Sequence, residues 1–550
     1  MTISNSRIRI VFDDNPQFIK HIFLSNGTTV CAQGKQTILV RTPTAVSEPT
    51  LLSYVKKADF QSNKAQIIFQ DKTGNWRAEL QIGSADSGIR FWIKVIAPEP
   101  IWLIEWRLTS LNVDEIIVPA LGGQSITKNM PDETTLSYKY PFWWNAQFAI
   151  GTTANSGLWL FSRDEKPNLK LLRVSKAHSG FALTYGYEAP APLISKKLEA
   201  DWYLDGFTGE WQIPVNCHRR WLERAFDLKE LISQRHYPDW AKDIKLILEI
   251  WGARRDAEAP MHTFDQMIER LEAWQKLHSP QETLVYLPGF AENGIDSHAP
   301  DYNPSIQCGG AEKFKQLIDT AHTLGYKVMI HTNVLAMTYC NPLFPEFKRH
   351  QVVDCFNRPQ SWGLDIDGDW LAEPYFAYIN PGAKEWGDLM VKVIGDLIKK
   401  FRIDAVFLDQ TLLAFNVSAG PNFIEGMRNH IKRLQRAFPE ILLAGEGIHE
   451  HVVDALPMTQ IHGIDSLAEI HGPAGQRSWR KVHPVSTYLF GKYIKFLPHL
   501  LTKHPSHPLF KFQESAYKRL SVIPALCLYD YQQPIDLPAV HEMIERAKKL

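Results

Sequence analysis

Hydrophobic and polar residues alternate with a period of two from about residue 6 to residue 210. Clear examples are RFWIKVIA (90–97), IWLIEWRLT (101–109) and LEADWYL (198–204). Such alternation is typical of strands that bury one face and solvate the other. Clusters of Gly, Asn, Asp and Pro separate the runs, as turns between short strands do. The pattern predicts an antiparallel β-sandwich over residues 1–212.

The spacing of apolar residues becomes helical over residues 215–235. One face of this expected helix carries Trp221, Ala225, Leu228 and Leu231. The HYPDW segment that follows has the composition of a turn. We therefore expect residues 213–240 to form a helix that links the sandwich to a second domain.

After residue 243, short apolar strands alternate with amphipathic helices. The expected strands are 244–251, 282–289, 327–333, 403–409, 441–447, 459–465, 493–500 and 519–529. Continuous apolar strands separated by helices indicate a parallel sheet that is covered on both faces. Eight such units within residues 241–550 match a closed (β/α)8 TIM barrel better than an open sheet. The predicted fold class is therefore multidomain, an all-β sandwich followed by an α/β barrel.

The charge balance and the hydropathy of the chain narrow the classes of partner that we expect. Lys plus Arg and Asp plus Glu each number 60 in a chain of 550 residues, so the formal net charge of zero gives no reason to expect a nucleic-acid partner. No apolar run approaches the ~20 residues that span a bilayer, and no signal peptide is visible at the N-terminus. We expect a cytoplasmic protein with no membrane partner, and the sequence leaves the oligomeric state open.

Metal and cofactor sites are not expected. The six cysteines are scattered and form no zinc-binding pattern. The LDIDGDW segment (364–370) resembles the start of a calcium loop, but Phe376 stands where an EF-hand-type loop needs Glu. We interpret that segment as a turn in a long insertion.

Two carboxylates follow neighbouring strands of the predicted barrel. Asp409 is the first charge after the apolar run AVFL, and Glu446 is the first charge after ILLA. Barrel enzymes carry their reacting groups at these strand ends, and side-chain alternation turns both carboxylates toward the same mouth. Glycoside hydrolysis needs such a pair, one to attack or activate water and one to protonate the leaving oxygen. Either residue alone could be structural, but the pair predicts Asp409 and Glu446 as catalytic.

Further candidates for substrate binding fall near the same mouth. They are Glu249 and Trp251 on the first strand, His331 and Asn333 on the third, Gln410 after the fourth, His462 and Asp465 on the sixth, and Trp144 of the PFWWNAQF segment in the sandwich. Each also has a structural reading, which is strand-end hydrogen bonding for the polar residues and core or interdomain packing for the aromatic ones. Of the adjacent Trp143 and Trp144, one could reach over the barrel mouth.

The VFLDQ and LLAGEG segments resemble the fourth- and fifth-strand ends of retaining α-glycosidase barrels, similar to the α-amylase superfamily and the endo-α-N-acetylgalactosaminidases. In those families the fourth-strand Asp is the nucleophile and the fifth-strand Glu the acid/base, which implies these roles for Asp409 and Glu446. A galactose-mutarotase-like sandwich, a helix and a barrel also follow one another in α-galactosidase relatives. In that clan a sixth-strand Asp is the acid/base, so Asp465 stays an alternative to Glu446.

Asp404 illustrates how strand position separates a structural from a catalytic carboxylate. The FRIDA segment is similar to an amylase motif in which Arg precedes the nucleophile by two residues, and this would nominate Asp404. Asp404 precedes the apolar run, however, and so belongs near the N-terminal end of the strand, where barrel carboxylates are usually structural. If Asp409 is the nucleophile, Phe407 occupies the position of the amylase Arg, which is a departure from that family.

The sequence therefore predicts a glycoside hydrolase that cleaves an α-glycosidic bond of an oligo- or polysaccharide with retention of configuration. A non-catalytic carbohydrate-binding protein or degenerate glycosidase is an alternative, since the 17 tryptophans would suit it equally well. A transglycosidase is another, because it shares the covalent intermediate and differs only in the acceptor.

Overall fold

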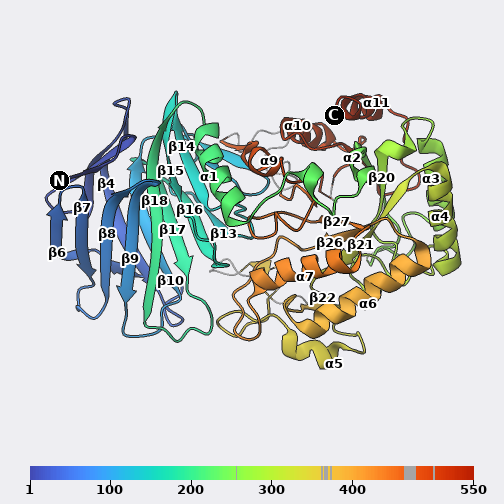
Figure 1. Ribbon diagram of the computed structural model, residues 1–550, viewed down its shortest axis with the longest axis horizontal. Coiled ribbons are helices and arrows are strands. Elements are labelled where there is room, and N and C mark those ends of the chain that lie inside the picture. The colour runs from blue at the N-terminus through green and yellow to red at the C-terminus, as the bar shows by residue number, and fades with distance from the viewer. Residues whose placement is uncertain (256, 361–362, 365–369, 372–374, 464–478, 500–501) are drawn as a thin grey trace.

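The computed structural model describes residues 1–550 except residue 256 and the segments 361–362, 365–369, 372–374, 464–478 and 500–501. Two regions lie side by side in Figure 1, with large β-sheets around the N-terminus on the left and a helix-covered barrel on the right. The LDIDGDW segment falls mostly outside the described residues.

Two antiparallel sheets form the N-terminal region. The first contains β1 (Thr2–Ser4), β2 (Ile8–Phe12), β3 (Phe18–Leu24), β4 (Thr29–Arg41), β5 (Thr50–Leu52), β10 (Leu103–Leu111), β13 (Thr135–Tyr140), β16 (Lys170–Ala177) and β17 (Gly180–Glu188). The second contains β6 (Tyr54–Gln61), β7 (Lys64–Gln70), β8 (Arg77–Ala85), β9 (Gly88–Ile96), β11 (Glu115–Val118), β12 (Gln124–Thr127), β14 (Phe148–Thr153), β15 (Ser156–Phe161), β18 (Lys197–Thr208) and β29 (Arg480–Val482).

The strand order of the first sheet is β1-β2-β3-β4-β10-β17-β16-β13, with β5 beside β4. That of the second is β29-β12-β11-β14-β15-β18-β9-β8-β7-β6. Along β9, Phe91, Ile93 and Val95 are fully buried whereas Arg90 points outward, which is the alternation expected of a strand with one core face. The antiparallel sheets predicted for this part of the chain are confirmed.

The second region is built on eight parallel strands. They are β19 (Leu246–Ile250), β20 (Thr283–Leu287), β21 (Lys327–Asn333), β26 (Ala405–Asp409), β27 (Leu442–Gly445), β28 (Met458–Gln460), β30 (Lys495–Leu497) and β31 (Ala525–Leu528). Their order is β30-β28-β27-β26-β21-β20-β19-β31. The backbone N–H of Ile523, just before β31, donates to the carbonyl of Phe496 in β30 at 3.3 Å, so the barrel is nearly closed. Seven of these strands lie within the ranges predicted for them, and β28 begins one residue before its predicted range of 459–465.

Helices and short elements occupy the connections. The α-helices are α1 (Gln212–Ala225), α2 (Asp239–Lys242), α3 (Phe264–Trp274), α4 (Gly310–Leu324), α5 (Phe344–Phe347), α6 (Lys384–Phe401), α7 (Phe423–Ala437), α9 (Val485–Phe490), α10 (Phe510–Arg519) and α11 (Pro538–Ala547). The 3₁₀ turns are η1 (Leu231–Ser233), η2 (Pro280–Glu282) and η3 (Lys348–His350). The connection from β21 to α6 carries two small ladders, β22 (Ala336–Thr338) with β25 (Phe376–Tyr378) and β23 (Gly363–Leu364) with β24 (Trp370–Leu371).

Local sequence explains where these helices begin and which face they bury. The hydroxyl of Thr263 accepts from the backbone N–H of Gln266, whose side chain returns the bond, and this capping box starts α3. Met267, Leu271 and Trp274, spaced three and four residues apart, are fully buried on one face of α3.

The expected helix over residues 215–235 is shorter in the structure. Helix α1 ends at Ala225, and Asp227 adopts a left-handed backbone with φ of 47° that breaks the helix. Leu228 and Leu231 therefore lie beyond α1, although their spacing continued the helical pattern.

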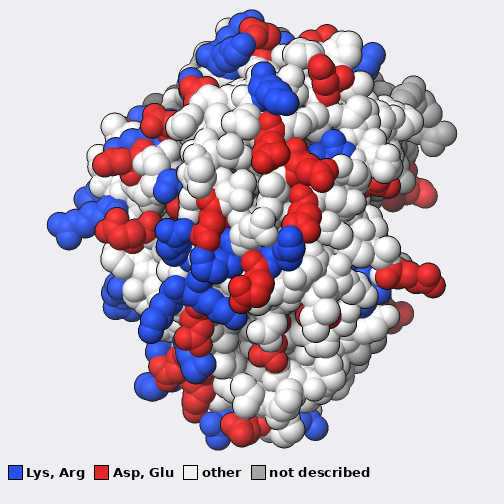
Figure 2. Space-filling view, turned by 90° about the vertical axis from the view of Figure 1, so that its right-hand side faces the viewer, with Lys and Arg blue, Asp and Glu red and all other residues white. Residues whose placement is uncertain are grey.

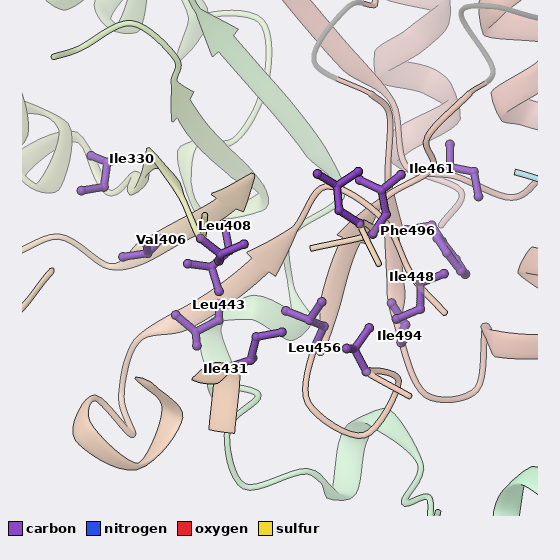
Figure 3. Packing of buried hydrophobic residues seen from close by; sticks show 14 of the residues in the cluster. Ile330, Val406, Leu408, Ile431, Leu443, Ile448, Leu456, Ile461, Ile494 and Phe496 are labelled. Atoms are coloured by element: carbon purple, nitrogen blue, oxygen red, sulfur yellow. The ribbon is translucent and has the colours of Figure 1, made fainter. Parts of the chain in front are cut away.

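Alternation along the barrel strands divides their side chains between two cores. On β26, Val406 and Leu408 pack outward in the same cluster as Ile431 of α7, as Figure 3 shows. Ala405 and Phe407 belong instead to the cluster inside the barrel. The interior face of β26 leads directly to Asp409.

The two regions are joined by backbone pairing and by a shared core. Strand β29 comes from the barrel part of the sequence but extends the second sheet, with Gln124 of β12 paired to Val482. Phe148 and Trp159 of the sandwich share a hydrophobic cluster with the barrel residues. The mouth of the barrel can therefore receive side chains from the sandwich.

The helical side of the barrel, which faces the viewer in Figure 2, carries intermingled basic and acidic residues. This mixture agrees with the equal totals of the two classes in the sequence. Among the described residues, no helix combines the length and the hydropathy that crossing a membrane requires.

Candidate active site

Asp409 and Glu446 lie next to each other at the ends of adjacent barrel strands. Asp409 ends β26 and Glu446 follows β27, two strands that pair in parallel with Leu408 opposite Gly445. Both side chains are almost completely buried, and each carboxyl group lies close enough to influence the ionisation of the other. The backbone N–H of Gln410, whose φ is 66°, donates to Oε2 of Glu446 at 2.8 Å. The carboxylate pair predicted from the sequence is thus brought together.

Asp409 shares its surroundings with a second aspartate, Asp296, in the loop after β20. The side-chain amide of Asn333 donates to Oδ2 of Asp296 at 2.8 Å and to Oδ2 of Asp409 at 3.3 Å. Nε2 of His331 lies 3.7 Å from Oδ1 of Asp296 and 3.9 Å from Oδ2 of Asp409. Nδ1 of His331 is hydrogen-bonded to the hydroxyl of Tyr286 at 2.7 Å. Tyr286 therefore orients the imidazole so that Nε2 faces both carboxylates.

These surroundings make ionisation of Asp409 unfavourable. Burial raises the pKa of Asp409 well above its usual range, and the negative charges of Glu446 and Asp296 raise it further. Within the pair, the proton is therefore expected on Asp409 rather than on Glu446.

Glu446 has the opposite environment. Nε2 of His462 lies 3.2 Å and Nε2 of His499 lies 3.6 Å from its Oε1. Burial alone would raise the pKa of Glu446, but the two imidazoles outweigh burial and lower it below its usual value. Two neighbouring carboxyl groups with pKa values pushed in opposite directions are the arrangement that acid–base catalysis uses.

The loop that follows Glu446 is anchored by a buried carboxylate that bridges three parts of the chain. Glu450 is fully buried, and its Oε1 lies 2.5 Å from Nε2 of His218 in α1. The hydroxyl of Tyr140 in β13 donates to Oε2 of Glu450 at 2.6 Å. The sandwich and α1 thereby fix the start of the β27–β28 connection.

The sandwich also supplies an aromatic wall to the mouth. The ring of Trp143 lies 4.8 Å from that of His462, centroid to centroid, and both residues line a small cavity together with Gln460 and Ile448. Trp144, which the sequence placed at the mouth, lies in the sandwich core instead. Its indole is fully buried and donates to the carbonyl of Phe148 at 2.9 Å.

The structure places the first-strand candidates apart from the carboxylate pair. β19 lies three strands from β26 in the barrel order. The indole N–H of Trp251 donates to Oε1 of Glu249 at 2.6 Å, and its ring packs on Tyr529 at 5.3 Å. Burial raises the pKa of Glu249 to about 8, so this side chain is mainly neutral at pH 7. These contacts give Glu249 and Trp251 a clear packing role on the β31 side of the barrel.

The remaining candidates divide into three cases. Gln410 contacts Glu446 through its backbone, and its side-chain amide donates to the hydroxyl of Tyr378 at 2.8 Å. His462 contacts Glu446 directly. Asp465, the alternative acid/base, lies outside the described residues.

Sequence reasoning missed His499, Tyr286 and Asp296. His499 could have been found, because it lies two residues after Leu497, whose side chain points into the barrel, and alternation puts it on the same face. Tyr286 could have been found in the same way, because it lies two residues after Leu284 on β20 and both side chains point into the barrel. Asp296 belongs to an irregular loop with φ of 56° and carries no periodic signal.

Asp404, at the opposite end of β26, is held by a set of donors. Nε2 of His322 lies 2.8 Å and Nζ of Lys327 2.7 Å from its carboxylate, and the backbone N–H of Val328 donates to it at 3.0 Å. Burial alone would raise the pKa of Asp404, but these hydrogen bonds lower it. The structural role expected for Asp404 agrees with these contacts.

Among the residues that the structure describes, two groups of side chains have donor atoms close enough together to hold a metal ion. They are Glu446 with His462 and His499, and Asp296 with His331 and Asp409, each with its ligand atoms within 4.8 Å of one another. Imidazole and carboxylate donors suit divalent transition metals such as zinc. The same atoms are those that set the protonation of the carboxylate pair.

Glycosidases are among the solved structures that share this fold. The ligand-free α-N-acetylgalactosaminidase NagBb from Bifidobacterium bifidum matches with a TM-score of 0.73 and 12% identity, over 100% of this chain and 93% of that chain. The α-galactosidase TtGalA from Thermus thermophilus, in complex with p-nitrophenyl α-D-galactopyranoside, matches with a TM-score of 0.53 and 13% identity, over 86% of this chain and 92% of that chain. At these identities the likeness shows the fold alone.

No curated protein matches the sequence. Residues 197–497 match the family model described as a domain of unknown function, DUF6259. The match takes in the end of the sandwich, α1 and most of the barrel, including both carboxylates. Because it spans more than half of the chain, this chain belongs to the DUF6259 family.

Proposed function

We propose that this chain is a retaining glycoside hydrolase that cleaves an α-glycosidic bond of an oligo- or polysaccharide, with Asp409 as nucleophile and Glu446 as acid/base. The observation that carries the proposal is the burial of these two carboxyl groups side by side at adjacent strand ends. The fold shared with an α-N-acetylgalactosaminidase and an α-galactosidase supports the same chemistry.

The closeness of the two carboxyl groups favours retention. Inverting enzymes leave room for a water and separate their carboxyl groups by roughly 6.5–9.5 Å, whereas retaining enzymes hold them about 5–5.5 Å apart. Adjacent strands lie about 4.7–4.9 Å apart, so carboxyl groups at the ends of β26 and β27 are nearer to the retaining separation than to the inverting one. A covalent glycosyl intermediate is therefore the simpler route.

The reaction needs the proton on Glu446, whereas the free site favours it on Asp409. Both arrangements belong to the same one-proton state of a coupled pair. Positive charge that develops at the anomeric carbon stabilises an ionised Asp409, and the leaving oxygen takes the proton from Glu446. His462 and His499 then favour the ionised Glu446 that must deprotonate water in the second step.

The resting protonation would suit the reverse roles, with Glu446 as nucleophile and Asp409 as acid. We propose the first assignment because the fourth-strand Asp and fifth-strand Glu resemble retaining α-glycosidase motifs. Mutants with substrates of different leaving groups separate the two assignments.

The first experiment is a screen of aryl α- and β-glycosides, with α-galactosides and α-N-acetylgalactosaminides foremost because they are the substrates that the matched enzymes' names give. Product anomers are followed by NMR from the first turnovers. We expect hydrolysis of an α-glycoside to release the α-anomer first. A β-anomer as first product would exclude retention, and binding without turnover would favour the carbohydrate-binding alternative.

A further inference from the structure

A hollow of about 450 Å³ lies on the outer face of the second sandwich sheet, over strands β6 to β9. Most of the side chains around it, such as those of Gln66, Gln81 and Trp92, alternate with buried residues along their strands and so point away from the sandwich core. The hollow is formed by residues of the N-terminal region alone. It is therefore separate from the carboxylate pair of the barrel.

A row of polar residues with one indole crosses this face from strand to strand. Asp59 is paired with Gln66, Gln66 with Gln81, and Gln81 with Trp92. The indole of Trp92 is partly exposed among exposed polar neighbours. An aromatic ring beside amides offers both a stacking face and hydrogen bonds.

The amides in the row are fixed in place. The side-chain N–H groups of Gln66 and Gln81 both donate to Oε1 of Glu79, at 2.6 and 2.8 Å. Two amides held by one carboxylate keep their orientation without a ligand, which lowers the entropy cost of binding.

The floor of the hollow is a position without a side chain. Gly83 stands in the next row, paired with Lys64 on one side and Arg90 on the other. A Cβ placed at Gly83 would meet only Cγ of Lys64, at 3.7 Å, within 4 Å. The site can therefore be filled by substitution without disturbing the sheet.

The charges of the face do not suit a nucleic acid. Arg90 is paired with Asp201 at 2.6 Å, Arg77 and Lys94 lie near Glu79, and Lys64 and Asp59 both line the hollow, so the charges of the face are balanced. Phosphate-rich ligands need an excess of positive charge. A peptide could add as a strand only at the free edge of β6, because β7, β8 and β9 pair on both sides, so strand addition would not fill the hollow over β7 to β9.

We propose that this hollow is a non-catalytic binding site for a neutral oligosaccharide chain. A pyranose ring stacks its C–H face on Trp92, and its hydroxyl groups bond to the amides of Gln66 and Gln81. The neutral ligand fits a face where the charges balance locally. The site works independently of the barrel, so its existence does not depend on the proposed hydrolysis.

The test uses the full-length chain with Asp409→Asn, which stops turnover, labelled and applied to a printed array of neutral plant, microbial and animal glycans. Trp92→Ala and Gly83→Gln are each added to this background. Tyr54→Ala is the matched control, because Tyr54 is an exposed aromatic on β6 that does not line the hollow. Titration of the bound glycans gives the affinities.

We expect a set of glycans whose affinity falls roughly ten-fold or more in Trp92→Ala and in Gly83→Gln but stays unchanged in Tyr54→Ala. With Asp409 intact, Trp92→Ala should hydrolyse a small aryl glycoside at the wild-type rate. Absence of any bound glycan, or binding that survives both hollow variants, would overturn the proposal. The second result would assign the binding to the barrel mouth, which leaves the proposed hydrolase unaffected.

Discussion

The aspartates at the two ends of strand β26 have opposite surroundings, and their pKa values are shifted in opposite directions. Asp404, before the strand, receives hydrogen bonds from His322, Lys327 and a backbone N–H, and its pKa is lowered. Asp409, the last residue of the strand, lies near the carboxylates of Glu446 and Asp296, and its pKa is raised. A carboxylate that accepts hydrogen bonds from several donors stabilises the fold. A carboxyl group beside other carboxylates has a shifted pKa that can serve catalysis, but it lowers the stability of the fold.

Replacement of Asp409 should have the largest effect. We expect Asp409→Asn to lose roughly 10⁴-fold or more in kcat on every substrate, because no covalent intermediate can form. Folding stability should stay about the same, since the amide, like the protonated Asp409 that the free site favours, places no charge beside Glu446 and Asp296. Initial rates and thermal unfolding measure both effects. A fully active variant, or one that is markedly less stable, would contradict the functional reading of this end of the strand.

Glu446→Gln should give a loss that depends on the substrate. Poor leaving groups need protonation and should lose about 10²–10⁴-fold, whereas activated aryl glycosides should react normally in the first step. Azide should then restore turnover by attacking the intermediate without a general base. Equal losses for all leaving groups without rescue would favour the reverse roles. If Glu446→Gln is fully active while Asp465→Asn is dead, the acid/base belongs to the sixth strand.

Asp404→Asn should have the opposite effects to Asp409→Asn, a loss of folding stability with activity retained. Because the pKa of Asp404 is lowered in the folded state, its carboxylate stabilises the fold above its unfolded pKa of about 4 and loses this contribution as the pH falls through the folded value. The variant should unfold with about 1–3 kcal/mol less free energy at neutral pH and retain kcat at permissive temperature. Denaturant unfolding at pH 7 and at lower pH checks this. If Asp404→Asn leaves the free energy of unfolding unchanged at pH 7, Asp404 does not have the structural role that distinguishes it from Asp409.

Asp296→Asn tests the smallest effect, the contribution of one neighbouring charge. Activity needs one proton shared between Asp409 and Glu446, and this proton is lost at alkaline pH. The negative charge of Asp296 raises the pKa at which the proton leaves. Its removal should move the alkaline limb of the kcat/KM profile to lower pH by about one unit. A limb that stays in place or moves upward would show that Asp296 does not influence the pair.

The parts that sequence predicted are those governed by periodicity. Strand alternation predicted the antiparallel sheets, the eight barrel strands and the shared mouth of Asp409 and Glu446. Periodicity failed where a single backbone angle decides, as at Asp227, which ends α1 early. It also failed at Trp144, because adjacent tryptophans point to opposite sides and only the tertiary fold selects Trp143 for the mouth.

Contacts between distant segments were beyond sequence reasoning. Asp296 approaches Asp409 from an irregular loop, and Glu450 meets His218 and Tyr140 across intervals of more than two hundred residues. The pKa shifts of the pair depend on such neighbours. Position along a strand could therefore nominate the two carboxylates but not their resting protonation.

The central claim is that Asp409 forms the covalent bond to the sugar. The most direct measurement is mass spectrometry of the chain after reaction with a 5-fluoroglycosyl fluoride of the sugar that it hydrolyses, followed by peptide mapping. We predict one added glycosyl group, carried by Asp409 and absent in Asp409→Asn. A label on Glu446, or no label together with inverted products, would contradict the assignment.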